Sequence, residues 1–150
     1  MINERKAVRA ILFNNNKEVA VMNVAENNYH KIPGGGVEDG EDLQMALIRE
    51  IKEEAGATAR VITELGRIIE KRTKYSFKQE SFCFIAEALT ISVPEFTDDE
   101  KKAGFSISWM PLEKAINLFE KERPEEYSAK FMHFRDLCFL MEAKKSDKFV

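Results

Sequence analysis

The sequence predicts a single α/β domain in which helices cover both faces of a β-sheet, an α/β/α sandwich. Three observations lead to this prediction. Strand-like stretches rich in β-branched and aromatic residues fill much of the chain, one helix-forming stretch lies between them at 42–55, and another closes the sequence at 128–145. The 150 residues, 44% of them apolar, suffice for one hydrophobic core and not comfortably for two, so residues 1–150 form one predicted domain.

The first two predicted strands form a hairpin. Residues 6–13 and 18–24 have strand-like composition, and the turn-forming Asn14-Asn15-Asn16 separates them. A short apolar segment, 29–32, follows and meets the run Pro33-Gly34-Gly35-Gly36. We expect a loop at this run, because proline lacks a backbone donor and glycine loosens the backbone.

A helix is predicted from Asp42 to Ala55. Asp42 is a suitable N-cap, and Gly56 stands where a helix is expected to end. The predicted buried stripe repeats at helical spacing and consists of Leu47, Ile48, Ile51 and Ala55.

Two longer strands are predicted after this helix. They span about 61–74 and 78–89, with a polar break at Tyr75-Ser76, and we expect them to pair with each other. The acidic segment 92–102 contains a proline and is predicted to be a loop.

The last third of the chain predicts one more strand and two helices. The strand covers 105–110 and ends at Pro111, and the helices cover 112–121 and 128–145. The final helix has an apolar stripe that we interpret as core-facing, with a dimer surface as the alternative. It comprises Phe131, Phe134, Leu137, Cys138 and Met141.

Composition excludes several classes of function. The net charge is −3, 33% of the residues are charged, and no basic stripe appears, so a binder of duplex nucleic acid is not expected. No apolar run approaches the roughly 20 residues that cross a bilayer, and no leader-like segment is seen, so we expect a cytoplasmic protein. Cys83 and Cys138 lie among apolar neighbours and predict two reduced core thiols.

Three glutamates gather on one face of the first predicted helix. Glu50, Glu53 and Glu54 are spaced i, i+3, i+4 beside the apolar stripe. Such like-charge neighbours cost roughly 0.2–0.5 kcal/mol per pair, and the end of a helix also disfavours anions. Helix stability therefore does not select the arrangement, whereas Mg²⁺ prefers oxygen ligands of this kind. The competing interpretation is a solvated face partly neutralised by Arg49 and Lys52.

The residues around this face add two further features. The glycines at 34–36 let a backbone approach an ion or a phosphate closely. Glu41 and Arg49 flank the first part of the helix, where an arginine can hold carboxylates in a fixed orientation.

Together these residues form a known pattern. Gly35 is followed after five residues by Glu41 and after seven more by Arg-Glu-Ile-Lys-Glu-Glu-Ala-Gly-Ala at 49–57. This segment, 35–57, resembles the Nudix box, and such a match arises by chance on the order of once in 10⁸ starting points. Ala57 departs from the family, which more often has a larger aliphatic residue there. The resemblance implies an α/β/α sandwich with a mixed β-sheet.

The resemblance also implies a mechanism. Glu50, Glu53 and Glu54 would bind Mg²⁺, with Mn²⁺ as a substitute and the carbonyl of Gly34 as a further ligand. Arg49 and Glu41 would brace them. The metal would lower the pKa of a water molecule and offset charge on phosphate oxygens.

The general base that the resemblance implies is Glu53, Glu50 or Glu100, in that order. Glu100 lies in the acidic segment Asp98-Asp99-Glu100, where relatives often supply an additional carboxylate. The competing interpretation of that segment is an exposed polar loop.

The implied substrate is a nucleoside diphosphate linked to another moiety, such as a nucleoside triphosphate, an oxidised nucleotide or a dinucleoside polyphosphate. Gly35 and Gly36 would lie against it. Tyr75 stands where relatives acting on dinucleoside polyphosphates carry a tyrosine, and His30 precedes the glycine run. A structural or solvent-facing histidine is the competing interpretation of His30.

Two alternatives from other classes stay open. A catalytically silent nucleotide-binding regulator would keep the fold, although such proteins usually lose box carboxylates and this chain keeps them all. A structural domain would have a merely solvated acidic helix and an interface at Phe131, Phe134 and Met141. An exposed stripe on the final helix would make a homodimer reasonable.

Overall fold

The computed structural model describes residues 2–25 and 29–146, and within them the strands form one seven-stranded sheet. The strand order is β3-β2-β1-β6-β5, with β4 paired to β1 and β7 paired to β2. β1 and β6 run parallel and the other pairs run antiparallel, so the predicted mixed sheet is confirmed. The strands are β1 (Asn3–Phe13), β2 (Glu18–Val24), β3 (Tyr29–Lys31), β4 (Gly34–Gly36), β5 (Ala57–Arg72), β6 (Phe77–Ile91) and β7 (Phe105–Pro111).

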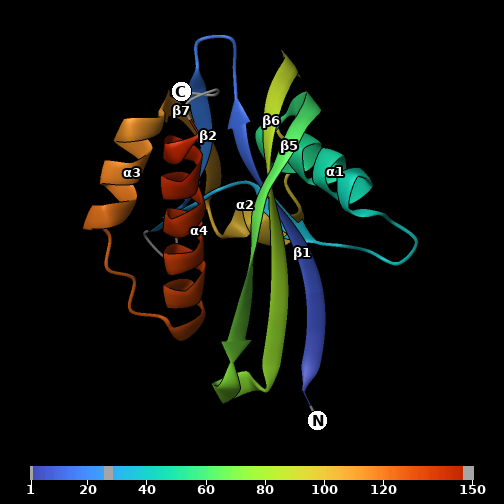
Figure 1. The fold of residues 1–150 in the computed structure, drawn as a ribbon, viewed down its shortest axis with the longest axis vertical. Coiled ribbons are helices and arrows are strands. Elements are labelled where there is room, and N and C mark those ends of the chain that lie inside the picture. Colours follow the sequence, from blue (N-terminus) through green and yellow to red (C-terminus); the bar gives the residue numbers. More distant parts are fainter. Residues whose placement is uncertain (1, 26–28, 147–150) are drawn as a thin grey trace.

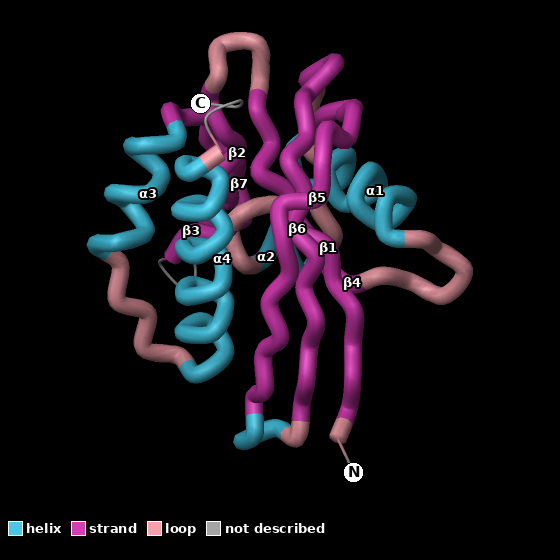
Figure 2. The backbone as a smooth tube through the Cα atoms, viewed as in Figure 1, coloured by secondary structure: helices cyan, strands magenta, loops and turns pink. Residues whose placement is uncertain are grey.

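Helices cover both faces of the sheet, which confirms the α/β/α sandwich (Figures 1 and 2). α1 (Leu43–Ala55) packs on one face, and α3 (Leu112–Lys121) and α4 (Tyr127–Lys145) pack on the other. The short α2 (Asp98–Lys102) precedes β7. No helix in the described part of the chain is long and apolar enough to span a membrane.

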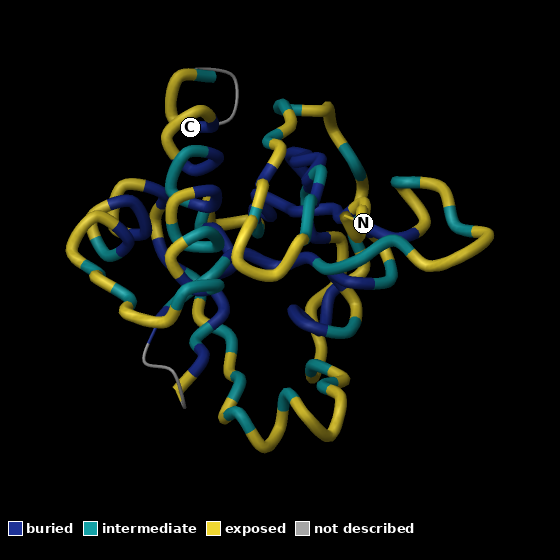
Figure 3. Tube along the Cα trace, turned by 90° about the horizontal axis from the view of Figure 1, so that it is seen from below, coloured by how far each residue is buried: buried dark blue, intermediate teal, exposed yellow. Residues whose placement is uncertain are grey.

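The central strand β1 contributes side chains to the hydrophobic clusters on both faces of the sheet. Successive side chains of a strand point to opposite faces. Val8 and Leu12 therefore join the cluster under α1, whereas Ile11 and Phe13 join the cluster under α3 and α4. Figure 3 shows the buried residues gathered where sheet and helices meet, with exposed loops around them.

The predicted first helix is present, and its ends follow the capping rules. The Asp42 side chain accepts a hydrogen bond from the Met45 N–H at 2.8 Å, and Gly56 ends the helix in the left-handed conformation at φ 66°. A Cβ at Gly56 would lie 2.3 Å from the Ser92 carbonyl oxygen, so both the conformation and the space require glycine.

The buried face of α1 differs from the predicted stripe at one position. Leu47, Ile51 and Ala55 are buried as predicted, but Ile48 is 37% exposed. The prediction for Ile48 was wrong because α1 turns the carboxylates of Glu50 and Glu54 toward the sheet, which leaves Ile48 at the rim.

The glycine run is a strand rather than the predicted loop. β4 pairs with Ala7–Arg9 of β1, and a Cβ at Gly34 would lie 2.1 Å from the Val8 carbonyl oxygen. Pro33 has no N–H to donate, but it stands just before β4, and its carbonyl accepts from the Ala10 N–H at 2.9 Å. Absent side chains thus let β4 lie directly against β1.

The predicted loop at 92–102 also contains a helix. Thr97 and Glu100 form a capping box at the start of α2, and the first turn is acidic, which suits the positive end of a helix. The prediction of a loop was therefore wrong for 98–102, because the capping hydrogen bonds stabilise a short helix there.

The core-facing prediction for the stripe on α4 was wrong for Phe134 and Met141, whereas Leu137 packs partly buried against the core. Phe134 is 69% exposed and Met141 is 46% exposed, while Phe131, Leu137 and Cys138 are half-buried. The helix instead buries Ala129, Arg135, Asp136, Phe139, Leu140 and Ala143. Arg135 and Asp136 have buried partners in Glu70 and Ile32. The helix therefore turns these two polar residues inward, in place of part of its apolar stripe. Both cysteines are free thiols, but only Cys83 is fully buried.

Candidate active site

An arginine fork holds the start of α1 to the loop before it. Arg49 donates through Nε and Nη2 to the two carboxylate oxygens of Glu41, at 2.7 and 2.9 Å, and Nη2 also donates to the Gly36 carbonyl at 3.0 Å. This contact lowers the pKa of Glu41 to about 2 and raises the pKa of Arg49. The fork that the sequence indicates between these residues is present in the structure.

Glu50 lies in a cradle formed by Gly35. It is 9% exposed, and Arg49 Nη1 donates to its Oε1 at 2.9 Å. A Cβ at Gly35 would lie 2.4 Å from that same Oε1, so the carboxylate fills the space that any other residue would occupy. The glycine is therefore required by the position of the carboxylate.

Glu53 is the most accessible of the three clustered glutamates. Its side chain is 35% exposed, and its Oε2 lies 3.5 Å from Arg49 Nη1. Partial burial and the adjacent Glu50 raise the pKa of Glu53. Like-charge crowding of this kind disfavours the ionised cluster unless a cation is present.

Glu54 is fully engaged by the strands. The Gly34 N–H donates to Oε1 at 2.8 Å and Lys31 Nζ donates to Oε2 at 3.3 Å. Burial raises the pKa of Glu54 to about 7, against the opposing effects of Lys31 and Gly34. Gly34 thus contacts the cluster through its N–H, and its carbonyl as a metal ligand stays a prediction.

Glu100 is brought to the cluster by α2. Its carboxylate accepts a capping bond from the Thr97 N–H at 2.9 Å. It also raises the pKa of both Glu53 and Glu54, after the larger effects of burial, so it lies within electrostatic reach of both. A residue far along the chain therefore extends the acidic surface of α1.

Two predicted substrate-binding residues lie elsewhere. His30 points away from the cluster: its N–H and Nδ1 contact the Glu122 carboxylate at 3.1 Å each. Tyr75 is in the 3-10 turn Thr73–Tyr75 that joins β5 to β6. The centroid of its ring lies 5.3 Å from the centroid of the Tyr127 ring. The structure does not join either residue to the glutamates.

The acidic side chains offer oxygen donors without a closed cage. Among residues 2–25 and 29–146, no group of three or more His, Cys, Asp or Glu residues has an arrangement ready to hold a metal. Both oxygens of Glu54 are already bonded, while Glu53 and Glu50 are engaged mainly by Arg49. This donor set fits Mg²⁺, which keeps several waters and takes few protein carboxylates alongside substrate phosphates.

Three cations near the glycines were missed by the sequence analysis. Lys31 follows His30 in β3, so its side chain points to the opposite face and reaches Glu54. The alternation of side chains along a strand could have indicated this contact. Arg9 is 4% exposed beneath Gly34, its Nε has no partner within the described residues, and burial and Arg135 lower the pKa of Arg9 to about 10. The Arg5 guanidinium lies where a Cβ at Gly36 would stand 2.9 Å away.

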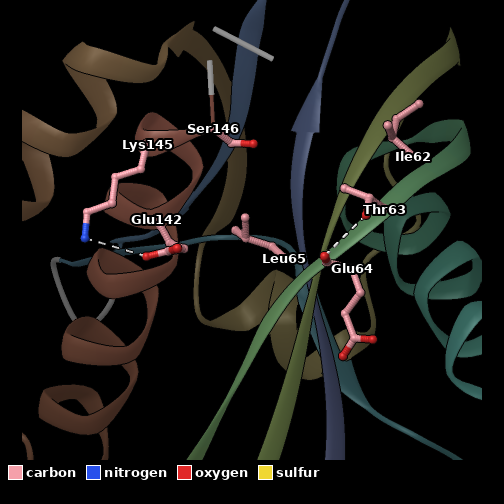
Figure 4. Close-up of a pocket in the computed structure, with 7 residues that line it drawn as sticks. All are labelled: Ile62, Thr63, Glu64, Leu65, Glu142, Lys145 and Ser146. Atoms are coloured by element: carbon pink, nitrogen blue, oxygen red, sulfur yellow. Dashed lines mark hydrogen bonds and ion pairs between the residues drawn. The ribbon is translucent and has the colours of Figure 1, made fainter. Parts of the chain in front are cut away.

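Two hollows differ in their relation to these residues. One of about 270 Å³ includes Arg5 in its wall, together with Glu4, Lys6, Ile69, Lys78 and Glu80. A larger, open hollow of about 710 Å³ lies between β5 and α4, where Glu142 and Lys145 form an ion pair at 3.8 Å (Figure 4). No residue of the acidic cluster lines the larger hollow, so the hollow is separate from the cluster.

Comparisons with known proteins agree with this geometry. The family model described as NUDIX domain matches residues 3–133. The chain is similar to Nudix hydrolase 2 of Arabidopsis thaliana, with 31% identity over 75% of this chain and 41% of that protein, so it spans less than half of that relative. It is also similar to diphosphoinositol polyphosphate phosphohydrolase 3-alpha of Mus musculus, with 27% identity over 80% of this chain and 72% of that protein.

Solved structures share the fold at low identity. A NUDIX hydrolase from Nitrosomonas europaea superposes with a TM-score of 0.71 at 14% identity, over 96% of this chain and 90% of that chain. The Caenorhabditis elegans Ap4A hydrolase superposes with a TM-score of 0.63 at 18% identity, over 97% and 98% of the two chains.

Proposed function

This chain belongs to the NUDIX domain family, and from this membership we propose that it is a Mg²⁺-dependent pyrophosphohydrolase. Its substrate is a nucleoside diphosphate linked to another moiety, such as a nucleoside triphosphate, an oxidised nucleotide or a dinucleoside polyphosphate. The observation that carries the proposal is the acidic face of α1, whose carboxylates are held by the Arg49 fork and the Gly35 cradle.

The arrangement favours a catalytic cluster over a solvated face. Glu50 and Glu54 are buried, although a buried carboxylate is costly unless it is paired. Arg49, Lys31 and the Gly34 N–H provide that pairing and fix the orientation of the carboxylates. Groups fixed in this way are suited to act on a reacting phosphate without further reorganisation.

Mg²⁺, with Mn²⁺ as a substitute, would be held by Glu50, Glu53 and Glu54. When bound, such an ion offsets negative charge on phosphate oxygens and lowers the pKa of a coordinated water. The chain itself orients the ligands through Arg49 and Glu41 and leaves Glu53 accessible. Glu53, then Glu50, then Glu100 are the candidates to accept the proton of the attacking water.

The surroundings favour a substrate with several phosphates. The Arg5 guanidinium lies beside Gly36, and Glu50 is its strongest charged neighbour. Lys6 and Lys78 line the same hollow, together with the carboxylates of Glu4 and Glu80. The Arg5 guanidinium, beside the cluster, would contact a phosphate beyond the one attacked. The name of the mouse relative makes a diphosphorylated inositol polyphosphate a second substrate class to be tested.

The test is hydrolysis by the full chain with Mg²⁺ or Mn²⁺. Substrates would be nucleoside triphosphates, an oxidised nucleotide, dinucleoside polyphosphates and a diphosphoinositol polyphosphate, and the phosphate-containing products would be followed. We expect metal-dependent cleavage that falls at least a hundredfold in Glu53→Gln. The matched control is Glu113→Gln, which removes an exposed carboxylate on the other face of the molecule and should leave the rate unchanged.

A silent nucleotide-binding regulator predicts the opposite result. It would bind one of these compounds in the presence of metal and turn over none of them. That outcome would refute the hydrolase proposal and establish the regulator in its place.

A further inference from the structure

A buried ionic cluster joins α4 to the sheet. Arg135 donates through Nε to Asp136 Oδ1 and through Nη1 to Glu70 Oε1, both at 2.8 Å. Glu70 also accepts from Gln79 at 3.0 Å and from Arg72 at 2.7 Å. Arg135, Asp136 and Glu70 are 1%, 0% and 4% exposed, so every group here depends on its partners for solvation.

One atom of this cluster reaches toward the acidic site. The second carboxylate oxygen of Asp136, Oδ2, accepts a hydrogen bond from the backbone N–H of Ile32 at 3.0 Å. The contact is buried and joins residues 104 positions apart in the chain. Ile32 itself is 1% exposed, so no solvent stands ready to replace the carboxylate.

The residues on either side of Ile32 contact the box. Lys31 and Gly34 both donate to the carboxylate of Glu54, at 3.3 and 2.8 Å. The intervening Pro33 is held by its carbonyl, which accepts from the Ala10 N–H. Asp136 therefore fixes the middle of a four-residue segment whose two ends fix Glu54.

We infer that Asp136 is a positioning residue for the acidic site: it holds the Ile32 peptide so that Lys31 and Gly34 present their donors to Glu54. This inference rests on the proposed function for its catalytic consequence. Asp136 lies beyond residues 3–133, the part of the chain that the family model matches, so the shared family pattern does not account for it.

The neighbouring Arg135 serves a different purpose from Asp136. Arg135 bonds Glu70 and Asp136 within the cluster, whereas Asp136 bonds the backbone of Ile32. Glu70→Gln therefore weakens the cluster while the Asp136–Ile32 hydrogen bond stays. This variant is the matched control, because it perturbs the same buried network without touching the segment that holds Glu54.

The first readout is amide hydrogen exchange of the full, metal-free chain, followed by NMR. We expect Asp136→Ala to speed exchange at the Gly34 amide at least tenfold more than Glu70→Gln does. The amide of Ile85, buried in β6, reports the overall loss of stability in both variants. Asp136→Asn keeps an oxygen that can accept from Ile32 and should restore most of the protection at Gly34.

The second readout is catalysis on whichever substrate the wild-type chain cleaves. We expect kcat to fall at least tenfold in Asp136→Ala, with KM changed less than threefold and the Mg²⁺ concentration for half-maximal rate raised. Glu70→Gln should keep kcat within about threefold. Where Asp136→Ala does not fold, Asp136→Glu replaces it, since the added methylene displaces the acceptor and keeps the charge.

The outcomes separate the two ideas. Equal loss of Gly34 protection and of kcat in the Asp136 and Glu70 variants would mean that the cluster only stabilises the fold, and the inference would be overturned. Unchanged Gly34 exchange in Asp136→Ala would overturn it as well. If the wild-type chain cleaves nothing, the proposed function fails, and hydrogen exchange alone still decides whether Asp136 positions the segment.

Discussion

Replacing Gly35 by alanine should disable the acidic site while leaving the fold intact. The added Cβ would lie 2.4 Å from Glu50 Oε1 and 2.6 Å from Cδ, whereas ordinary contact begins at 3.4 Å. The carboxylate must therefore move by about 1 Å, and Arg49 Nη1, now at 2.9 Å, must follow it or lose the bond. A misplacement of about 1 Å near a reacting centre can cost roughly a hundredfold in rate.

The expected cost in stability is smaller than the cost in rate. The three atoms nearest the new Cβ all belong to the carboxyl group of Glu50, the end of one flexible side chain, so Glu50 can swing aside. Overpacking of this kind costs about 1–3 kcal/mol. We expect the thermal midpoint to fall by several degrees and the variant to stay folded at 25 °C.

The assay is kcat/KM for the substrate that the wild-type chain cleaves best, with thermal unfolding measured in parallel. Gly66→Ala is the control, because a Cβ at Gly66 would meet no atom within 4 Å. The reasoning would be refuted if Gly35→Ala kept kcat/KM within threefold of Gly66→Ala. It would also be refuted if both variants lost activity equally.

The remaining predictions concern stability. Burial alone would raise the pKa of Glu70, but Arg135 outweighs it and the pKa is lowered to about 2, so Glu70 contributes stability above about pH 4.5 that is lost as the pH falls toward 2. Urea unfolding between pH 6 and 2.5 should show this loss, and Glu70→Gln should flatten the curve. Arg9→Met removes a buried charge whose pKa is lowered to about 10, and should raise the free energy of unfolding by about 1 kcal/mol; a fall above 1 kcal/mol would contradict this. Gly56→Ala forces a left-handed residue and a Cβ at 2.3 Å from a backbone oxygen, so it should cost at least 2 kcal/mol in chemical unfolding. Millimolar Mg²⁺ should raise the thermal midpoint of the wild-type chain, and an equal rise in Glu53→Gln would argue against metal binding at the cluster.

Local signals explain which parts of the fold were predicted. Strand composition, the Asn-rich turn, the Asp42 cap and the left-handed Gly56 each act within a few residues, and the structure confirms the elements they define. The glycine strand and the outward stripe of α4 depend on distant partners. β4 exists because β1 lies beside it, and α4 turns as it does because Arg135 finds Glu70 sixty-five positions away.

The same distinction applies to the site. Glu41, Arg49 and the glutamates of α1 lie close in sequence, so helical spacing alone could group them. Lys31, Arg9 and Asp136 reach the site or its support only through strand pairing and helix packing, which no local pattern specifies. One signal was present: an adjacent Arg and Asp inside an otherwise apolar helical stretch indicates buried partners.

The parallel pairing of β1 with β6 also bears on how the molecule reaches its native state. Residues 3–13 pair with residues 77–87, so the central ladder closes only after the intervening chain, box included, has been gathered into a loop. Contacts of such large sequence separation slow folding, because the chain loses the conformational entropy of the loop before the hydrogen bonds between β1 and β6 stabilise it. A fragment ending at Ala57 would contain all 23 residues of the box and still lack β6, Glu100 and Asp136. We therefore expect the site to be completed only when this ladder closes, because the motif alone lacks these residues.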